Sequence, residues 1–157
     1  FFDRNAKAIT YDYWHGQWKL DRDGNTAMFP FGFGCSYTSF EYSDVRVEIG
    51  EVVKVQCSLR NTGAQNGATV MQVYVSRNDS TVERPLRRLI AFKRVDIAAG
   101  ETVQIECEVP FQRLATRDVL SHSWFVEGGT WNCEVGQFSG DPQSLSASFH
   151  VPERIEL

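Results

Sequence analysis

The sequence predicts an all-β protein in which two antiparallel sheets pack as a sandwich. Two segments alternate apolar and polar side chains with a period of two, which is the pattern of half-buried strands. Further short strand candidates follow one another from residue 40 onward, and no long segment with the 3.6-residue period of a helix lies between them. Such a succession is typical of an antiparallel sandwich, because an α/β sheet needs helices between its strands.

The two clearest strands share one pattern. In Val52–Leu59 every second residue is apolar, and the turn residues Asn61-Thr62-Gly63 follow. The same alternation continues from Val103 to Val109 and stops at Pro110. The segment Phe111–Leu120 stays open because it has room for a helical turn. The remaining candidates, each set off by Gly, Pro, Asn, Asp or Ser, are Phe40–Ile49, Ala68–Ser76, Leu89–Ile97, Ser123–Val126, Trp131–Gly136 and Leu145–Val151.

The alternations also predict the core, since successive residues of a strand point to opposite faces of the sheet. We expect the sandwich to span residues 40–152 and residues 153–157 to form a tail. The expected core residues are Val53, Val55, Leu59, Val103, Ile105, Val109, Trp131 and Val135.

Residues 1–39 show no clear period, and we expect an extended, aromatic-rich arm with one short hairpin at Asp23-Gly24. Of the 20 Phe, Trp and Tyr residues, 12 lie in residues 1–42. Burial of a large ring is worth about 1.5–3 kcal/mol, and so short an arm cannot bury all its rings within itself. The rings must therefore pack on something else.

Two groups of arm rings have different expected partners. Phe29–Phe33 adjoin the first strand, and we expect these rings to be buried against the sandwich. The second group lies nearer the N-terminus, between residues 11 and 18. We expect some of its members to form an exposed apolar patch, which marks either a contact with another domain or a surface for self-association. The alternative is that every ring folds onto the sandwich. This outer group of candidate contact residues is Tyr11, Tyr13, Trp14, His15 and Trp18.

Charge and hydropathy exclude two classes of partner. The 16 Lys and Arg against 20 Asp and Glu give a net charge of −4, and the densest basic stretch, Arg84–Arg94, is interleaved with apolar residues. We therefore expect no nucleic-acid partner. No stretch approaches the length of a membrane span. The chain starts without Met and in the middle of a pattern, so we expect it to be a piece of a longer protein, in which case the missing signal peptide says nothing about secretion.

Four cysteines, Cys35, Cys57, Cys107 and Cys133, form no Cys-x-x-Cys pair, and the histidines are far from them in sequence, so we expect no zinc site. A disulfide framework is the alternative to free thiols. Three of the four cysteines lie on the apolar side of their alternations, where thiols behave as small core hydrophobes. Free thiols are favoured, which weakly indicates a cytoplasmic setting and leaves a secreted or periplasmic one open.

A search for catalytic chemistry finds no convincing group. In Ser121-His122-Ser123 neighbouring side chains would point to opposite faces, so the histidine does not activate a serine. No spacing singles out a pair of carboxylates of the kind that glycosidases use. Gly32-Phe33-Gly34 is better explained as a tight turn than as a phosphate loop. Asn78-Asp79-Ser80 fits an N-glycosylation pattern that is common by chance. We expect no catalytic, cofactor-binding or metal-binding residues.

The segment Phe29–Phe40 is similar to the signature FPFGxGLSYTxF. That signature is found near the C-terminus of glycoside hydrolase family 3 enzymes, the family of many β-glucosidases and β-xylosidases, so the chain resembles this family. Four further segments follow in the family's order over roughly residues 11–151. Asn61–Ser76 resembles NTGxxxGxEVVQLYVS, Arg84–Val95 resembles RPxKxLKGFKRV, Ala99-Gly100-Glu101 resembles PGE, and Gly129–Gly136 resembles GxYxVxVG.

The resemblance implies a C-terminal fibronectin type III-like domain, an immunoglobulin-like sandwich, preceded by the connecting segment of a family 3 enzyme. In such an enzyme a barrel domain supplies an Asp nucleophile, and an α/β domain often supplies the acid/base Glu; neither domain is in this chain. Tyr11–Gly24 resembles the connecting segment but departs from it at Gln17 and Trp18. Cys35 stands where the family usually has Leu, and Ala91 where it usually has Gly, a change that would be costly if the position required positive φ.

The function that follows is a non-catalytic accessory module of a β-glycosidase, packed against the catalytic domains of the parent chain. One alternative is a carbohydrate-binding module, with Trp14 and Trp18 as candidate platforms for sugar rings. The other is a general adhesion or scaffold sandwich. Fold alone does not decide among the three.

Overall fold

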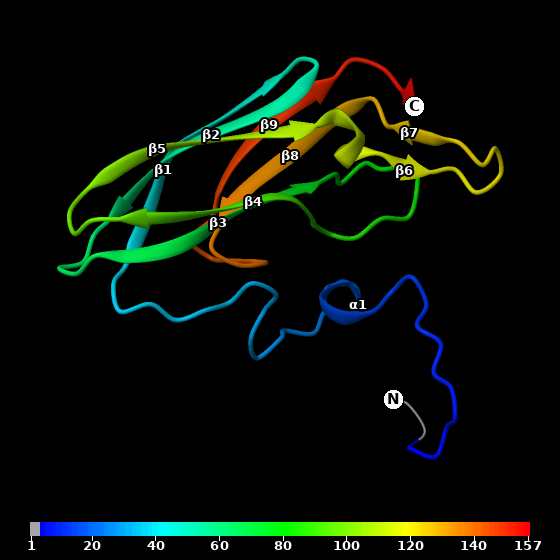
Figure 1. Cartoon of the computed structure of the whole chain (residues 1–157). Coiled ribbons are helices and arrows are strands. Elements are labelled where there is room, and N and C mark those ends of the chain that lie inside the picture. The colour runs from blue at the N-terminus through cyan, green and yellow to red at the C-terminus, as the bar shows by residue number, and fades with distance from the viewer. Residues whose placement is uncertain (1–3) are drawn as a thin grey trace.

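The computed structural model describes residues 4–157, so Phe1 and Phe2 of the predicted arm lie outside the described part. Two antiparallel sheets pack face to face, as predicted (Figure 1). The first has the strand order β1-β2-β5 and the second the order β4-β3-β8-β9. Their bounds are β1 Phe40–Ile49, β2 Val52–Asn61, β3 Gly67–Ser76, β4 Arg88–Ile97, β5 Thr102–Pro110, β8 Gly129–Gly136 and β9 Leu145–Val151.

A third, smaller antiparallel sheet was not predicted. It has the order β10-β7-β6, with β6 at Thr116–Arg117, β7 at Trp124–Val126 and β10 at Ile155–Glu156. The strands β6 and β10 have two residues each, which is too short for any alternation to be visible in the sequence. Because β10 pairs with β7, the last residues of the chain are part of a sheet. The 3₁₀ helix η1 occupies Phe111–Leu114, in the segment that the sequence left open.

The predicted core is confirmed at seven of its eight positions, from Val53 in β2 to Val135 in β8. Val103, next to the start of β5, is only partly buried, whereas Ile105 and Val109 in the same strand are buried. Trp131 is among the largest side chains in the core and stacks on Phe149, with ring centroids 6.3 Å apart. This ring contact joins neighbouring strands β8 and β9 from inside the sandwich.

The cysteines are free in the structure, and three of them are buried. Cys57 in β2 lies opposite Met71 in β3, with 3.2 Å between the sulfur atoms, so these side chains bridge the two sheets. Ala91 lies beside a register shift between β3 and β4 but does not have a positive φ. Alanine in place of glycine is therefore tolerated without backbone strain.

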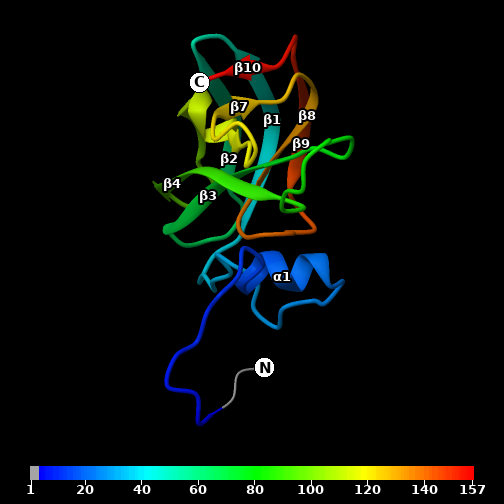
Figure 2. The ribbon, with the colours of Figure 1, turned by 90° about the vertical axis from the view of Figure 1, so that its right-hand side faces the viewer.

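The expected hairpin at Asp23-Gly24 is wrong. Residues Gly16–Arg22 form a short helix, α1, and Asp23-Gly24 ends it. Gly24 has a φ of +69°, and the backbone N–H of Asp23 donates to the carbonyl of Lys19 at 3.0 Å, as is usual at the C-terminus of a helix. None of the helix residues is buried. Both views show α1 below the strands, with the described residues before it extending away from the sandwich and the segment after it running beneath the strands to β1 (Figures 1 and 2).

Candidate functional site

The five candidate contact residues of the outer arm lie together. The Tyr13 ring contacts Trp14 edge to face and also lies against Trp18, at centroid distances of 5.1 and 5.6 Å. His15 lies between Tyr11 and Trp18. Tyr11 and Tyr13 are 73% and 52% exposed, whereas Trp14 and Trp18 are partly buried. The arm therefore presents one aromatic cluster to solvent, formed by Tyr11, Tyr13, Trp14, His15 and Trp18.

Polar contacts hold this aromatic cluster on the sandwich. The indole N–H of Trp14 donates to Oε1 of Glu83, in the loop between β3 and β4, at 3.0 Å. The side-chain oxygen of Gln17 accepts the backbone N–H of Phe31 at 3.0 Å. Partial burial raises the pKa of Tyr13, while the Arg88 charge acts in the opposite direction. The cluster thus rests on the β3–β4 loop.

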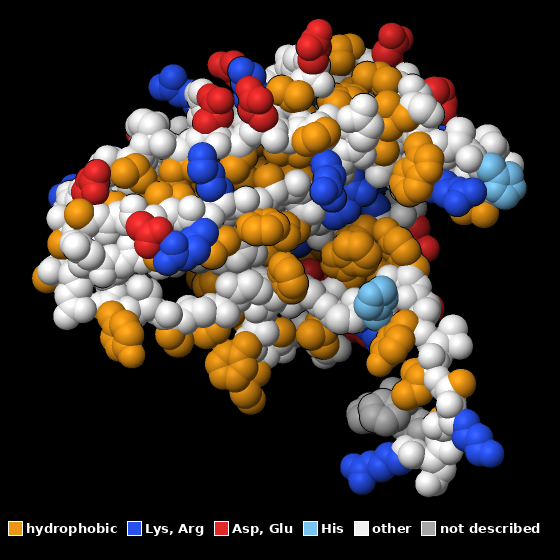
Figure 3. All heavy atoms as spheres, in the orientation of Figure 1, with side chains coloured by type: hydrophobic (Ala, Val, Ile, Leu, Met, Phe, Trp, Pro, Cys, Tyr) orange, Lys and Arg blue, Asp and Glu red, His pale blue; other side chains and the backbone are white. Residues whose placement is uncertain are grey.

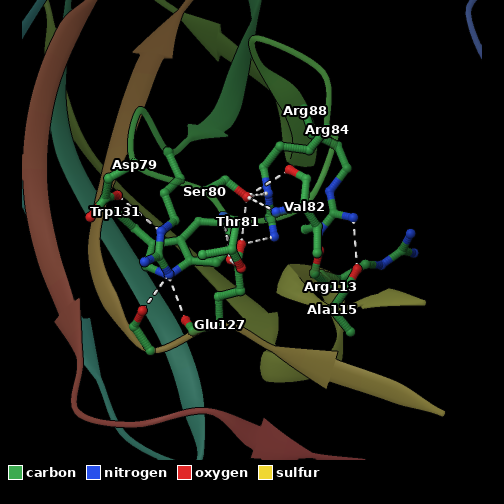
Figure 4. A network of polar contacts seen from close by, with 12 residues as sticks. Asp79, Ser80, Thr81, Val82, Arg84, Arg88, Arg113, Ala115, Glu127 and Trp131 are labelled. Atoms are coloured by element: carbon green, nitrogen blue, oxygen red, sulfur yellow. Dashed lines mark hydrogen bonds and ion pairs between the residues drawn. The ribbon is translucent and has the colours of Figure 1, made fainter. Parts of the chain in front are cut away.

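The β3–β4 loop is itself fixed by a buried carboxylate, Glu127, just after β7 (Figure 4). Glu127 accepts hydrogen bonds from the Ser80 hydroxyl at 2.6 Å and from the backbone N–H and hydroxyl of Thr81 at 2.9 and 2.8 Å. Arg84 forms an ion pair with it, and the Arg84 guanidinium lies over the ring of Trp131. The loop that receives the arm is therefore attached to the core.

The electrostatics of this network favour the ionised form of Glu127. Burial alone would raise the pKa of Glu127, but the hydrogen bonds from Ser80 and Thr81 and the charge of Arg84 lower it below the ordinary value. Burial lowers the pKa of Arg84, and the Glu127 charge opposes that effect. Each charge thus stabilises the charged form of its partner.

Sequence reasoning missed this network. Glu127 is a single carboxylate between a strand and two glycines, and nothing local points to Arg84, 43 residues away. In the sequence Arg84 stands out only as the first residue of a basic stretch and of a family-like segment, and neither assigns it a role. The Ser80 hydroxyl donates a hydrogen bond to Glu127, so the serine of Asn78-Asp79-Ser80 has a structural role.

The prediction that Phe29–Phe33 are buried is wrong. Phe29, Phe31 and Phe33 are 69%, 57% and 41% exposed. The segment contacts the sandwich through its backbone instead: the carbonyl of Phe31 accepts the N–H of Ser139 at 2.9 Å. The N–H of Phe33 donates to the carbonyl of Pro30 in a turn, and the Phe33 ring contacts the rings of Phe138 and Phe29. Hydrophobic side chains consequently gather along the lower side of the molecule (Figure 3).

Two hollows adjoin the aromatic cluster. A pocket of about 340 Å³ lies between the arm and the outer face of the β4-β3-β8-β9 sheet, with Trp18, Phe31 and Tyr74 in its walls. A groove of about 700 Å³ lies between Tyr13 and the small sheet, where Trp124 lines it. Both are within the usual size range of small-molecule sites, about 300–1,000 Å³.

Within residues 4–157, no group of three or more His, Cys, Asp or Glu side chains is arranged to hold a metal ion. Over the same residues, no helix is long and apolar enough to span a membrane. His122 lies in an exposed turn with a φ of +56°, and its ring is 3.4 Å from Arg117, while Ser121 and Ser123 contact each other. These side chains do not form a nucleophile with its base.

Comparison with known proteins identifies what the chain is similar to. Residues 69–139 match the fibronectin type III-like domain family. A probable β-glucosidase M of Aspergillus fumigatus is 34% identical over 152 aligned positions, which cover 83% of this chain and 19% of the relative. A xylan 1,4-β-xylosidase of Xylanibacter ruminicola is 31% identical over 144 positions, which cover 90% of this chain and 17% of the relative.

The solved structures agree with the sequence relatives. The structure of β-glucosidase 3B from Thermotoga neapolitana in complex with α-D-glucose superimposes with a TM-score of 0.86 and 33% identity. The match covers 93% of this chain and 20% of that protein. The chain therefore spans about a fifth of the length of the proteins that it resembles.

Proposed function

We propose that this chain, which contains the fibronectin type III-like domain of glycoside hydrolase family 3 enzymes, serves as a non-catalytic accessory module that packs against the catalytic domains of a β-glucosidase-like parent. In this assignment the module contributes no group to bond cleavage. It fixes the arrangement of the domains that do.

The observation that supports this function is the aromatic surface of the arm. The arm is attached to the sandwich by the Trp14–Glu83 hydrogen bond and by the Phe31 carbonyl, yet Tyr11, Tyr13 and the Phe29–Phe33 turn remain exposed. Large contiguous apolar surfaces on soluble proteins mark contact sites with other proteins or domains. Because the relatives have four-fifths of their length outside the matched region, the catalytic domains are the proposed partner.

The assignment is tested in a chimera. The matching segment of the Thermotoga neapolitana β-glucosidase is replaced by this chain, and hydrolysis of an aryl β-glucoside and thermal unfolding are measured. We expect the chimera to be active and to unfold as one cooperative unit. Tyr11→Ser combined with Phe29→Ser should lower the unfolding temperature of the chimera by several degrees while changing the isolated chain little, because both rings are largely exposed in the isolated chain and would be covered only at the interface.

A matched control is Leu120→Ser, which removes an exposed apolar side chain from the turn between β6 and β7. It should leave the chimera unchanged. Equal effects of the arm and control variants would contradict the interdomain role. The isolated chain should hydrolyse no glycoside, and turnover by pure chain that is lost on substitution of one of its own Asp or Glu residues would contradict the non-catalytic assignment.

A further inference from the structure

The groove of about 700 Å³ beside Trp124 is formed by segments that are far apart in the sequence. Tyr13 and Trp18 of the arm line it, together with Trp124 of β7 and Val119 in the turn before that strand. Tyr13 and Trp124 are 52% and 51% exposed, so half of each ring is left uncovered in the isolated chain. Exposed apolar surface of this kind marks a contact site.

Two arginines that line the groove carry charges that no carboxylate neutralises. Arg88, at the start of β4, donates from Nη1 to the carbonyl of Ala115 at 2.9 Å and from Nη2 to the carbonyl of Arg113 (Figure 4). The guanidinium has further N–H donors beyond these two contacts. Arg117, in β6, has its Nη2 3.4 Å from the His122 ring. Within residues 4–157, neither arginine forms an ion pair.

The other charged side chains of the groove do not offset these two arginines. Arg154 lies 3.6 Å from Asp118 and 2.6 Å from Glu156, so its charge and that of Asp118 are already paired. Glu83 is the remaining acidic residue that lines the groove, and its Oε1 accepts the indole N–H of Trp14 at 3.0 Å. Two unpaired positive charges therefore face one negative charge, and the groove has a positive excess.

The surroundings of Arg88 favour the arrival of a negative charge. Burial lowers the pKa of Arg88, and the charges of Arg84 and Arg113 lower it further. A carboxylate in the groove would stabilise the ionised Arg88 and would also attract Arg117. A basic group would be repelled by both arginines and would find only Glu83 to attract it. The charges thus select an acidic partner.

We propose that this groove receives an acidic segment of the parent's catalytic domains, in which carboxylates alternate with apolar side chains. The apolar side chains lie between Tyr13 and Trp124, and the carboxylates pair with Arg88 and Arg117. A free anion would use the arginines and leave the rings uncovered, whereas Tyr, Trp and Arg together are the residues that carry most binding energy in protein interfaces. The inference rests on the accessory role proposed above, and it adds the place of contact and the charge of what is bound there.

The proposal is tested by titrating the chain with two capped peptides, acetyl-DLEF-amide and acetyl-KLKF-amide, followed by NMR of backbone amide and indole signals. We expect saturable binding of the acidic peptide, with the largest shifts at Tyr13, Thr116 and Trp124, and binding of the basic peptide that is weaker by about fivefold or more. Sodium chloride at about 0.5 M should weaken the acidic peptide, because salt screens exposed charges. Equal binding of the two peptides, or no binding of the acidic one, would overturn the proposal. So would sulfate that shifts the same signals at equal concentration, since the groove would then be a simple anion site.

A charge reversal locates the contact. Arg117→Glu should weaken the acidic peptide by about threefold or more, whereas Arg46→Glu, an exposed arginine of β1 that does not line the groove, should leave its affinity unchanged. Both positions are exposed, so neither variant should change the unfolding temperature by more than a few degrees. Equal affinities of the two variants would overturn the placement. That result would leave the accessory role standing, because the role is tested separately in the chimera.

Discussion

Arg84 and Glu127 form an ion pair in which both side chains are shielded from water, at 11% and 7% exposed. The Arg84 guanidinium lies 4.8 Å from the centre of the Trp131 ring, so the pair joins the β3–β4 loop to the core of the sandwich. A buried ion pair gives little net stability, because desolvation of both charges offsets their attraction. Removal of one partner is costly, because the other charge is then left buried alone.

Glu127→Ala is therefore expected to lower the free energy of unfolding by about 3–5 kcal/mol, because it leaves Arg84 unpaired and frees Ser80 and Thr81. Urea denaturation measures the change. The control is Asp96→Asn, which breaks an exposed pair with Arg94 and should cost about 0–1 kcal/mol. A loss at Glu127 no larger than at Asp96 would show that the pair is not shielded.

The stability should also depend on pH through Glu127. Its pKa is lower in the folded chain than its ordinary value of 4.5, so it contributes stability that is fully present above pH 4.5 and is lost as the pH falls through the folded pKa. Glu127→Gln cannot ionise and lacks this contribution. The difference in unfolding free energy between the native chain and this variant should therefore shrink as the pH is lowered below about 4.5. A difference that stays constant down to pH 3 would contradict the lowered pKa.

The strands could be predicted from the sequence, because a strand that is buried on one face has an apolar side chain at every second position. Phe40–Ile49 and Leu145–Val151 have the predicted bounds in the structure. The helix α1 could not be predicted in this way, since it has seven residues and buries none of them. Trp14, just before the helix, donates a hydrogen bond to Glu83, 69 residues away along the chain. Contacts between residues far apart in the sequence cannot be recognised from a local pattern.

The candidate site was predictable in part. The concentration of rings in the arm indicated a surface, and the five outer residues lie together. The prediction that Phe29–Phe33 are buried was wrong because rings at every second position resemble one buried face of a strand. In the structure the backbone of Phe31, and not its ring, makes the hydrogen bond to the sandwich. Arg84 and Glu127 escaped notice because a pairing between distant charges leaves no local pattern.

The four thiols should react at different rates. Cys35 is exposed and should react rapidly with a thiol reagent in the native chain. Burial raises the pKa of Cys57 to about 12 and that of Cys133 to about 12, and it also raises the pKa of Cys107, so these three should react slowly. Titration should find one fast group in the native chain and four in denaturant. Fewer than four in denaturant would indicate a disulfide.

Exposed arm rings should contribute to association and not to stability. Phe29→Ser and Tyr37→Ser, combined with Met28→Ser, remove three exposed apolar side chains. The free energy of unfolding should change by no more than about 0.5 kcal/mol per substitution, as is usual at surface positions, while self-association measured by sedimentation should decrease. Trp131→Ala, in the core, should cost about 3–5 kcal/mol. A large loss of stability in the triple variant would mean that the rings are packed within the chain.

Gly32 is the position where the arm turn depends on glycine. Its φ is +84°, and an added Cβ would overlap the side-chain amide of Gln72, which donates to the carbonyl of Gln137 and so ties β3 to the end of β8. Gly32→Ala should therefore cost about 1–2 kcal/mol from the backbone conformation and more from the displaced Gln72. Gly34→Ala, two residues on, meets no atom within 4 Å and has no positive φ, so it should have little effect. Urea denaturation measures both changes, and equal stabilities of the two alanine variants would contradict this role of Gly32 in the turn.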